Sequence, residues 1–271
     1  MVNAENDAPY SRMLGVKQIP SDEICPIHHI NKIKVIGSRI KIEPYCPKCE
    51  SEAREKELDQ LADKVKKDSY LSYLKIYSLF DRKDTLNYTF DNFKVAKDSK
   101  EELVKNMARK IAGEYYKDKD KKFNSLFFGK SGTGKTHLAM AILNAVNLNA
   151  QPMQRCLFFS VTKLLDAKRD YFNDPVNHLW SKDYTERVIK DADLVVLDDL
   201  GAESAASQAN NFIQDTIFSL YELNQRVITT TNLSMNELKA KYHERLISRI
   251  LEGGKGHLID FTNLADKRME K

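Results

Sequence analysis

The sequence predicts an α/β fold: a P-loop domain whose parallel sheet is flanked by helices, preceded by a small metal-binding module and a linking helix. Three observations support this fold class. Apolar runs alternate with amphipathic helical patterns after residue 125, a glycine-rich loop follows the first run, and cysteine pairs are confined to the N-terminal segment. Continuous apolar runs are typical of strands buried on both faces of a parallel sheet.

Length and composition limit the organisation. A chain of 271 residues has room for one medium domain and a smaller module. Lys and Arg total 43 against 39 Asp and Glu, a net charge of +4, which permits contact with nucleic acid without indicating it. The sequence has no apolar run of membrane-spanning length and no signal-peptide pattern at its start, so we expect a cytoplasmic protein.

The N-terminal segment carries two pairs of soft metal ligands. Cys25 and His28 are separated by two residues, as are Cys46 and Cys49. This spacing suits a structural, tetrahedral Zn²⁺ site. His29 is an alternative to His28 as a ligand, and unliganded cysteines in a loop are the alternative to a metal site.

The segment between the two pairs predicts a β-hairpin. Residues 32–36 and 39–42 flank the turn residues Gly37 and Ser38. Such a hairpin brings the pairs together, and zinc would supply folding free energy that so small a core lacks. The fourth cysteine, Cys156, lies in an apolar run, and we expect it in the core.

Changes in composition divide the chain into three parts. We expect a zinc-binding module in residues 1–49, a helical linker in 50–84 and a larger α/β domain in 85–271. Leu58, Leu61 and Val65 lie at helical spacing within dense mixed charge, which predicts an exposed helix from 50 to about 80.

Strands and helices alternate through the larger domain. After a helix at about 100–116, the expected strands are residues 125–128, 155–160, 194–197 and 226–231. The expected helices begin at His137 and span 161–172 and 208–223. Ligands in parallel sheets bind outside the carboxyl ends of the strands, so the site is expected there.

Residues 129–136 fit the phosphate-binding pattern G-x-x-x-x-G-K-[ST] at every fixed position. Its backbone N–H groups cradle phosphates, Lys135 reaches the β- and γ-phosphates, and the Thr136 hydroxyl is placed for Mg²⁺. The predicted nucleotide-binding residues here are Gly129, Lys130, Ser131, Gly132, Thr133, Gly134, Lys135, Thr136 and His137.

Two carboxylates follow the apolar run 194–197. We expect Asp198 to bind Mg²⁺ through a water ligand and Asp199 to orient the attacking water as a general base. Two aspartates that merely end a strand at a turn are the alternative.

Polar residues after the last strand complete the predicted site. Asn232 is placed to contact the γ-phosphate or the water, or else to cap a helix. Arg245 and Arg249 share one helix face, from which an arginine can reach a neighbouring subunit's γ-phosphate. A solvated helix face is the alternative for the arginine pair.

In this order, residues 129–136, Asp198, Asp199, Asn232 and the arginine pair resemble an AAA+ ATPase. Their spacing is similar to that of the DnaC/DnaI helicase loaders and their IstB-like relatives, over roughly residues 89–268. The resemblance implies that Asn232 is the first sensor, Arg249 the arginine finger acting in trans, and Arg268 a second, nucleotide-binding sensor. Most AAA+ proteins carry Glu where Asp199 stands, so slow, switch-like hydrolysis is left open beside rapid turnover.

Basic and aromatic residues interleave before the acidic strand. The expected contacts to single-stranded DNA are Lys168, Arg169, Tyr171 and Phe172, because aromatic rings stack on bases while Lys and Arg follow phosphates. In the alternative, this is an ordinary amphipathic helix with Leu164, Leu165 and Phe172 in the core.

The resemblance implies an ATP- and Mg²⁺-dependent loader of a replicative hexameric helicase onto single-stranded DNA. The zinc module would grip the helicase, and the ATP site would mediate self-association. Two alternatives remain open. One is an IstB-like transposition ATPase that acts on duplex DNA, and the other is a non-hydrolysing, ATP-switched adaptor of host replication proteins, such as a phage-encoded one.

Overall fold

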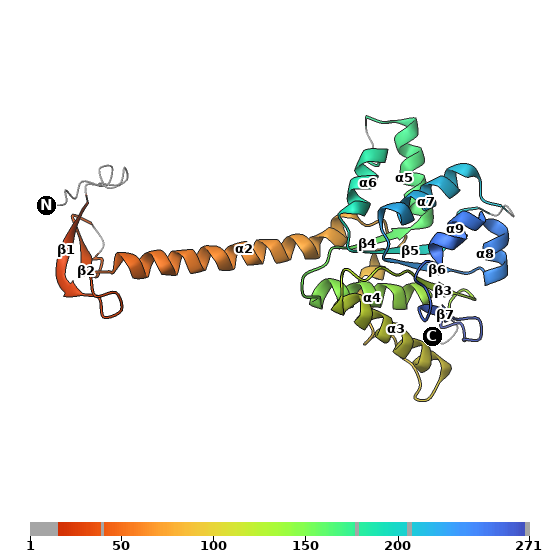
Figure 1. The fold of residues 1–271 in the computed structure, drawn as a ribbon, viewed down its shortest axis with the longest axis horizontal. Coiled ribbons are helices and arrows are strands. Elements are labelled where there is room, and N and C mark those ends of the chain that lie inside the picture. The colour runs from red at the N-terminus through yellow and green to blue at the C-terminus, as the bar shows by residue number, and fades with distance from the viewer. Residues whose placement is uncertain (1–15, 39–40, 177–178, 205–207, 269–271) are drawn as a thin grey trace. The chain divides into compact units, whose positions relative to one another are not determined.

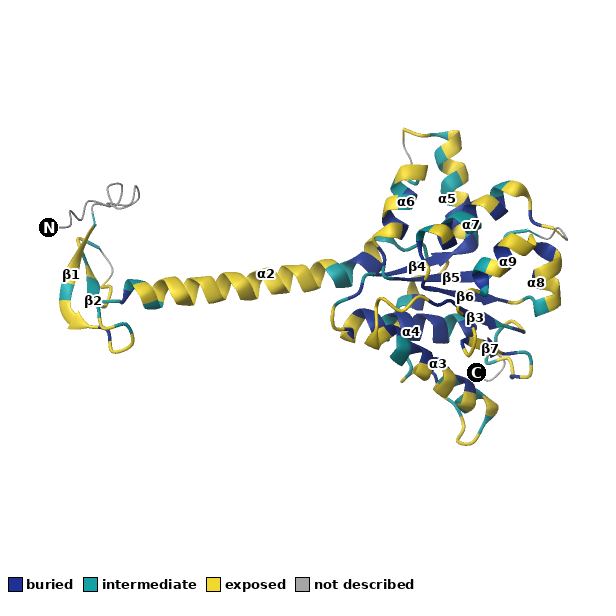
Figure 2. Ribbon diagram, viewed as in Figure 1, coloured by how far each residue is buried: buried dark blue, intermediate teal, exposed yellow. Residues whose placement is uncertain are grey.

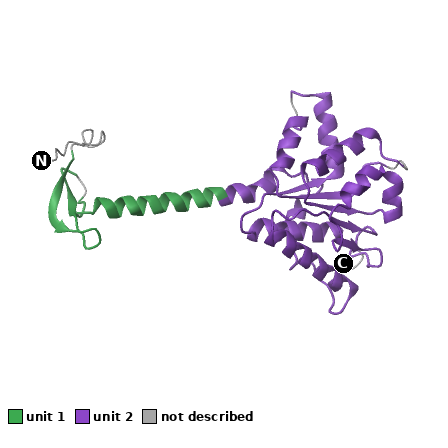
Figure 3. Cartoon of the chain, viewed as in Figure 1, with its two compact units in different colours: residues 1–66 green, residues 67–271 purple. Residues whose placement is uncertain are grey.

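The computed structural model describes residues 16–38, 41–176, 179–204 and 208–268. The chain divides into two compact units, residues 1–66 and 67–271 (Figure 3). The long helix α2 (Pro47–Tyr77) contributes residues to both units. Among the described residues, no helix combines the length and apolar character that a lipid bilayer requires.

The first unit is built on an antiparallel pair of strands, β1 (Lys17–Ile24) and β2 (Asn31–Ile36). The predicted pairing of 32–36 with 39–42 is therefore wrong, since β2 pairs with β1, and Ile33 forms an isolated bridge with Tyr45. Residues 39–40 of the expected second arm lie outside the described residues. The chain reverses instead at Cys25, whose N–H donates to Ile30 O at 2.8 Å. The first ligand pair thus lies in the hairpin turn.

Helix α2 begins immediately after Cys46, with Pro47 in its first turn, where a missing backbone N–H is tolerated. Its middle is exposed, as Figure 2 shows, and the Leu58, Leu61 and Val65 side chains are 60%, 57% and 60% exposed. An ion pair between Arg54 and Glu50, at 3.3 Å and one helical turn apart, adds local support. The expectation of an exposed helix in this part of the chain is confirmed.

The second unit contains a parallel sheet of five strands in the order β4-β5-β6-β3-β7 (Figure 1). The strands are β3 (Ser125–Phe128), β4 (Cys156–Ser160), β5 (Leu194–Leu200), β6 (Val227–Thr231) and β7 (Leu258–Asp260). The short β7 was not predicted, because three residues carry too little periodicity to be recognised. The α/β class with a parallel sheet is confirmed.

Helices cover both faces of the sheet. One hydrophobic cluster joins Leu157, Phe159, Val195 and Leu197 to helices that include α5 (Val161–Asn173) and α7 (Asn211–Leu223). The second joins the alternate strand residues to α3 (Lys100–Lys117) and α4 (Lys135–Asn149). Successive side chains along a strand point to opposite faces, so the two clusters cover the two faces of the sheet.

Shorter elements complete the unit. They are the 3₁₀ helix η1 (Lys83–Asn87) and the helices α6 (Lys182–Lys190), α8 (Met235–Lys241) and α9 (Glu244–Ile250). Helix α8 starts with a capping box, in which the Ser234 side chain accepts from Glu237 N–H and the Glu237 carboxylate accepts from Ser234 N–H. Asn232 lies two residues before this cap, so its side chain remains available for the site.

Candidate nucleotide and metal sites

The glycine-rich loop connects β3 to the N-terminus of α4. Gly134 is the residue before the helix, and its φ of 96° lies in the left-handed region. A Cβ atom at this position would lie 2.5 Å from the Phe93 ring. Only glycine therefore allows the loop to enter the helix here, and the free N–H groups of the first helical turn form a site for phosphate.

Lys135 is held over the loop. Its Nζ donates to Gly129 O at 2.8 Å and to Lys130 O at 2.5 Å. Burial lowers the pKa of Lys135 to about 8, while the nearby Asp199 and Asp198 carboxylates act in the opposite direction. A phosphate group at the loop would add negative charge and favour the protonated amine.

Asp198 is buried at the carboxyl end of β5. Thr230 on the adjacent strand β6 donates its hydroxyl hydrogen to Asp198 Oδ1 at 2.6 Å. Burial raises the pKa of Asp198 to about 7, and hydrogen bonds with Thr230 and Thr136 limit the rise. A carboxylate beside a hydroxyl offers the hard oxygen ligands that Mg²⁺ prefers, so these residues fit the expected metal.

Asp199 reaches the same site because the strand is irregular. Pairing of β5 with β6 shifts register between Leu197 and Leu200, and Asp199 has a φ of 60°. Consecutive residues of a regular strand point to opposite faces, whereas a bulge can redirect a side chain. Asn232 Nδ2 donates to Asp199 Oδ1 at 2.5 Å, and burial raises the pKa of Asp199.

These groups line one pocket of about 500 Å³. Of the predicted residues, the pocket brings together Ser131, Gly132, Gly134, Lys135, Thr136, His137, Asp198, Asp199, Asn232 and Arg268. Gly129, Lys130 and Thr133 belong to the loop without lining the pocket, and the Thr133 hydroxyl donates to Lys130 O at 2.8 Å.

Sequence reasoning missed one side of this pocket. The additional lining residues are Asp81, Arg82, Asp84, Thr85, Tyr88, Phe158 and Lys267. Most precede the glycine-rich loop by more than forty positions and match no motif. The aromatic residues Tyr88, Phe90 and Phe93 were the available signal, although no local pattern links them to a nucleotide site.

His137, in α4, contacts the unpredicted side of the pocket near Tyr88. Its ring stacks on Tyr88 with centroids 4.5 Å apart and an interplanar angle of 4°. Nε2 lies 3.0 Å from Thr89 O and 2.8 Å from Asn92 Oδ1, and burial lowers the pKa of His137. The neutral ring with hydrogen on Nε2 satisfies these contacts, leaving the Tyr88 side chain beside the pocket.

The arginine pair lies elsewhere. Arg249 pairs with Glu222 at 2.6 Å and Glu252 at 3.0 Å, and Arg245 lies over the Phe218 ring, 4.0 Å from its centroid. Both line a separate surface concavity of about 700 Å³ and neither lines the nucleotide pocket. Within one chain, the structure does not bring Arg249 to the phosphate loop.

The expected DNA-binding residues lie on α5. Arg169 pairs with Asp166 at 3.2 Å, and its guanidinium lies over the Phe212 ring. Tyr171 contacts Phe172, whose side chain is 69% exposed. The alternative that placed Phe172 in the core is wrong, although Leu164 and Leu165 are buried as it required. Lys168 and Phe172 line a groove of about 300 Å³ between α5, α6 and α7.

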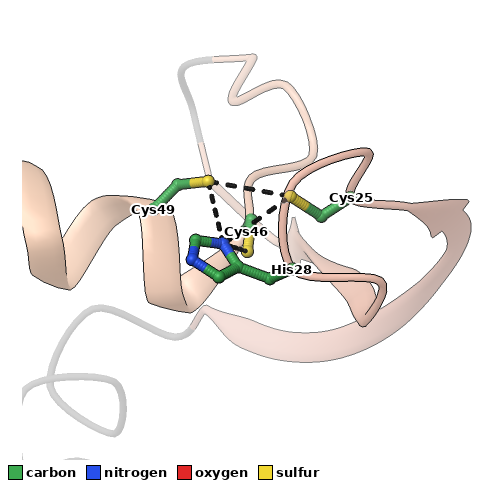
Figure 4. A group of neighbouring side chains, drawn as sticks. All are labelled: Cys25, His28, Cys46 and Cys49. Atoms are coloured by element: carbon green, nitrogen blue, oxygen red, sulfur yellow. Dashed lines mark hydrogen bonds between the residues drawn. The ribbon is translucent and has the colours of Figure 1, made fainter.

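In the first unit, Cys25, His28, Cys46 and Cys49 converge, as Figure 4 shows. Their ligand atoms all lie within 4.8 Å of one another, with the Cys25 and Cys49 sulfurs 3.6 Å apart. His28 Nδ1 lies 3.3 Å from Cys49 Sγ and 3.5 Å from Cys46 Sγ. Tetrahedral zinc requires S–S edges of about 3.8 Å and S–N edges of about 3.6 Å. The four residues fit zinc, and His28 rather than His29 belongs to the group.

Comparison with known proteins assigns the larger domain to a recognised group. Residues 85–256 match the model of the family described as the bacterial DnaA ATPase domain. The chromosomal replication initiator protein DnaA of Onion yellows phytoplasma (strain OY-M) is 30% identical over 171 residues, which cover 61% of this chain and 31% of that protein. The DnaA of Francisella philomiragia is 32% identical over 167 residues, which cover 60% and 30%. The chain spans about a third of the length of these relatives.

Solved structures share the fold. The DnaC helicase loader has a TM-score of 0.54 and 21% identity, covering 66% of this chain and 99% of that chain. AMPPCP-bound DnaA from Aquifex aeolicus has a TM-score of 0.51 and 19% identity, covering 70% and 54%. Domain III of the Thermotoga maritima initiator DnaA has a TM-score of 0.50 and 23% identity, covering 66% and 67%. At these identities the likeness concerns the fold alone.

Proposed function

Because this chain belongs to the bacterial DnaA ATPase domain family, we propose that it loads a replicative hexameric helicase onto single-stranded DNA. Its larger domain is an AAA+ ATPase domain of the replication-initiator or helicase-loader type. The observation that carries the proposal is the converged cluster of Cys25, His28, Cys46 and Cys49 in a unit separate from the ATPase core. A loader needs a helicase contact apart from its nucleotide site, and the resemblance to DnaI-type loaders implies that the zinc module provides it. Such work would take place in the cytoplasm.

Residue roles in the nucleotide site are part of this proposal. Lys135 and the loop N–H groups would bind the phosphates of ATP, and Arg268 would add a second cation at the pocket. Thr136 and Asp198 would hold Mg²⁺. Asp199 would orient the attacking water and accept its proton, with Asn232 fixing the carboxylate through the observed hydrogen bond.

We propose that Arg249 acts between subunits. Its guanidinium lies outside the nucleotide pocket of its own chain and lines a surface concavity at α9, where it would contact the ATP site of a neighbouring subunit. The Arg249 side chain would leave Glu222 and Glu252 when the subunits assemble. One guanidinium does not have enough N–H groups to pair fully with two carboxylates and a phosphate. Self-association through the ATP site follows from this assignment.

Single-stranded DNA is the proposed nucleic-acid ligand. The exposed Phe172 ring offers a stacking surface, and Lys168 and Arg169 on the same helix offer charge for phosphates. Replacing both Lys168 and Arg169 with Ala should weaken single-strand binding and reduce its salt dependence. Unchanged affinity at two salt concentrations would remove this surface from the proposal.

Zinc is proposed as a structural cofactor of the first unit. Four protein ligands would fill a tetrahedral shell and leave no open position for substrate, which is the arrangement of a closed, non-catalytic site. The metal would then hold the hairpin and the start of α2 together. This gives the proposed helicase contact a defined shape.

A loading assay tests the function. Full-length protein, the hexameric replicative helicase of the same cell and circular single-stranded DNA are mixed with ATP, and helicase retained on the circle is measured. We expect retention to require ATP and to be lost in the Cys46→Ser/Cys49→Ser double variant. A chain that neither binds the helicase nor increases its retention would refute the loader.

The rival functions predict different results. An IstB-like ATPase would capture a transposase and act on duplex DNA. An ATP-switched adaptor would bind replication proteins with equal ATP turnover in wild type, Asp199→Asn and Lys135→Ala. An origin-binding initiator is a further candidate, favoured by the sequence match to DnaA over residues 85–256. Specific binding of duplex origin DNA would support that initiator against the loader.

A further inference from the structure

The Cys/His cluster has a neighbour that its ligand pattern does not include. Glu52 lies on the second turn of α2, and its Oε1 is 2.9 Å from His28 Nε2. The Glu52 side chain is 65% exposed and the His28 side chain 15% exposed. The contact therefore joins the mostly buried His28 ring to the exposed Glu52 carboxylate.

The two nitrogens of His28 have different partners. Nδ1 faces sulfur, at 3.3 Å from Cys49 and 3.5 Å from Cys46, whereas Nε2 faces the Glu52 carboxylate. A histidine that binds a metal through one nitrogen must carry its hydrogen on the other. An ionised carboxylate only accepts, so its contact with Nε2 selects the form in which Nδ1 presents a lone pair to the cluster.

The helix places Glu52 for this contact. Cys46, Cys49 and Glu52 are spaced by three residues, so two thiols and a carboxylate follow neighbouring positions along one side of the helix start. His28 comes from the hairpin turn between β1 and β2. The Glu52–His28 hydrogen bond thus links the turn to α2 directly, without a metal ion between the two residues.

We infer that Glu52 is a positioning residue for metal binding, which orients the His28 ring and fixes its hydrogen on Nε2. This inference rests on the zinc site proposed above. A surface ion pair with no metal-binding role would contribute little, because the attraction between exposed charges is weakened by water and screened by salt. Carboxylates that hold a metal-ligating histidine typically change metal affinity about 10- to 100-fold when removed.

The test measures Zn²⁺ affinity of the full chain by competition with a chromophoric chelator. Glu52→Ala should weaken binding about 10- to 100-fold. Glu52→Gln keeps an oxygen that can accept from Nε2 and should recover part of the loss. Glu55→Ala is the matched control, since Glu55 is an exposed carboxylate on the same helix and is not one of the four converging ligands. This variant should bind zinc as tightly as wild type does.

A second measurement detects the orientation of the ring directly. In the zinc-loaded protein, the Nε2–H proton of His28 should exchange slowly enough for detection by ¹⁵N-resolved NMR, and Glu52→Ala should lose this signal while retaining zinc at saturating metal. Circular dichroism of the zinc-saturated variants checks that α2 remains folded.

The outcomes separate the inference from the zinc site itself. Failure of wild type to bind zinc would refute the zinc site and the inference with it. Tight wild-type binding with Glu52→Ala within about threefold of it would overturn the inference alone. Equal losses in Glu52→Ala and Glu55→Ala would also overturn it, because they would indicate a general effect of negative charge.

Discussion

Thr230 connects the two acidic residues of the nucleotide site, since its hydroxyl donates to the Asp198 carboxylate at Oδ1, at 2.6 Å, and accepts from the backbone N–H of Asp199 at 2.9 Å. One side chain on β6 therefore orients the buried Asp198 and supports the irregular backbone at Asp199. A substitution at Thr230 therefore tests the support of both acidic residues at once.

Thr230→Val should destabilise the domain. Valine has nearly the shape of threonine, but it leaves the Asp199 N–H unpaired and removes one donor from a buried carboxylate, at a cost of about 1–3 kcal/mol. Urea unfolding measures the change. Thr230→Ser keeps the hydroxyl and should lie closer to wild type, and equal stability of the Val and Ser variants would contradict the assigned hydrogen bonds.

Asp199→Asn should retain ATP binding and lose turnover. The amide keeps the size of the side chain but cannot accept a proton from water, and general-base catalysis typically contributes about 10²- to 10⁴-fold. Phosphate release and the Kd of a fluorescent ATP analogue are measured together. Lys135→Ala, in contrast, should lose nucleotide affinity. Wild-type turnover in Asp199→Asn would eliminate the assigned base.

Glycine-to-alanine substitutions should have opposite effects at two positions. Gly134→Ala places a Cβ 2.5 Å from the Phe93 ring at a φ of 96°, so nucleotide affinity and stability should both fall. Gly113, within α3, has no atom within 4 Å of an added Cβ. Gly113→Ala should raise the free energy of unfolding by about 0.5–1 kcal/mol. Thermal unfolding and ATP binding are measured for both variants. A loss of ATP binding in Gly113→Ala would contradict the prediction that only the glycine of the phosphate loop affects the nucleotide site.

Metal removal should affect the two units differently. Chelation, or Cys49→Ser, should unfold the hairpin region, because the described first unit buries few apolar residues beyond the ligands themselves. ATP binding by the second unit should persist, since its core contains no ligand of the cluster. Cys156→Ser is the control: Cys156 is buried in β4, and its substitution should leave zinc content unchanged. Persistence of the hairpin fold after chelation would refute a structural role for zinc.

Several features could be predicted because consecutive residues produce them. The phosphate loop is built from the consecutive residues 129–136. The order of strands and helices could be predicted from the apolar runs that form β3 to β6. The ligand pairs of the cluster were readable for the same reason. The spacing of neighbouring residues determines such features, so they can be predicted without knowing the tertiary structure.

Other features depend on contacts between distant segments. The Asp199 bulge needs β6 beside β5, the Tyr88–His137 stack joins positions 49 residues apart in sequence, and β2 pairs with an upstream strand instead of the expected downstream arm. No local pattern specifies these partners, because register and packing are decided by which segments share a core.

The sequence by itself determined that this protein binds a nucleotide through residues 129–136 and offers four soft metal ligands, since each group is set by short-range chemistry. Only the tertiary structure decided which residues share the nucleotide pocket, from Asp81 to Arg268, that Arg249 lies outside it, and that Glu52 meets His28. Those relationships arise because the folded chain brings distant segments together, a process that burial of apolar surface drives and that motif spacing does not record.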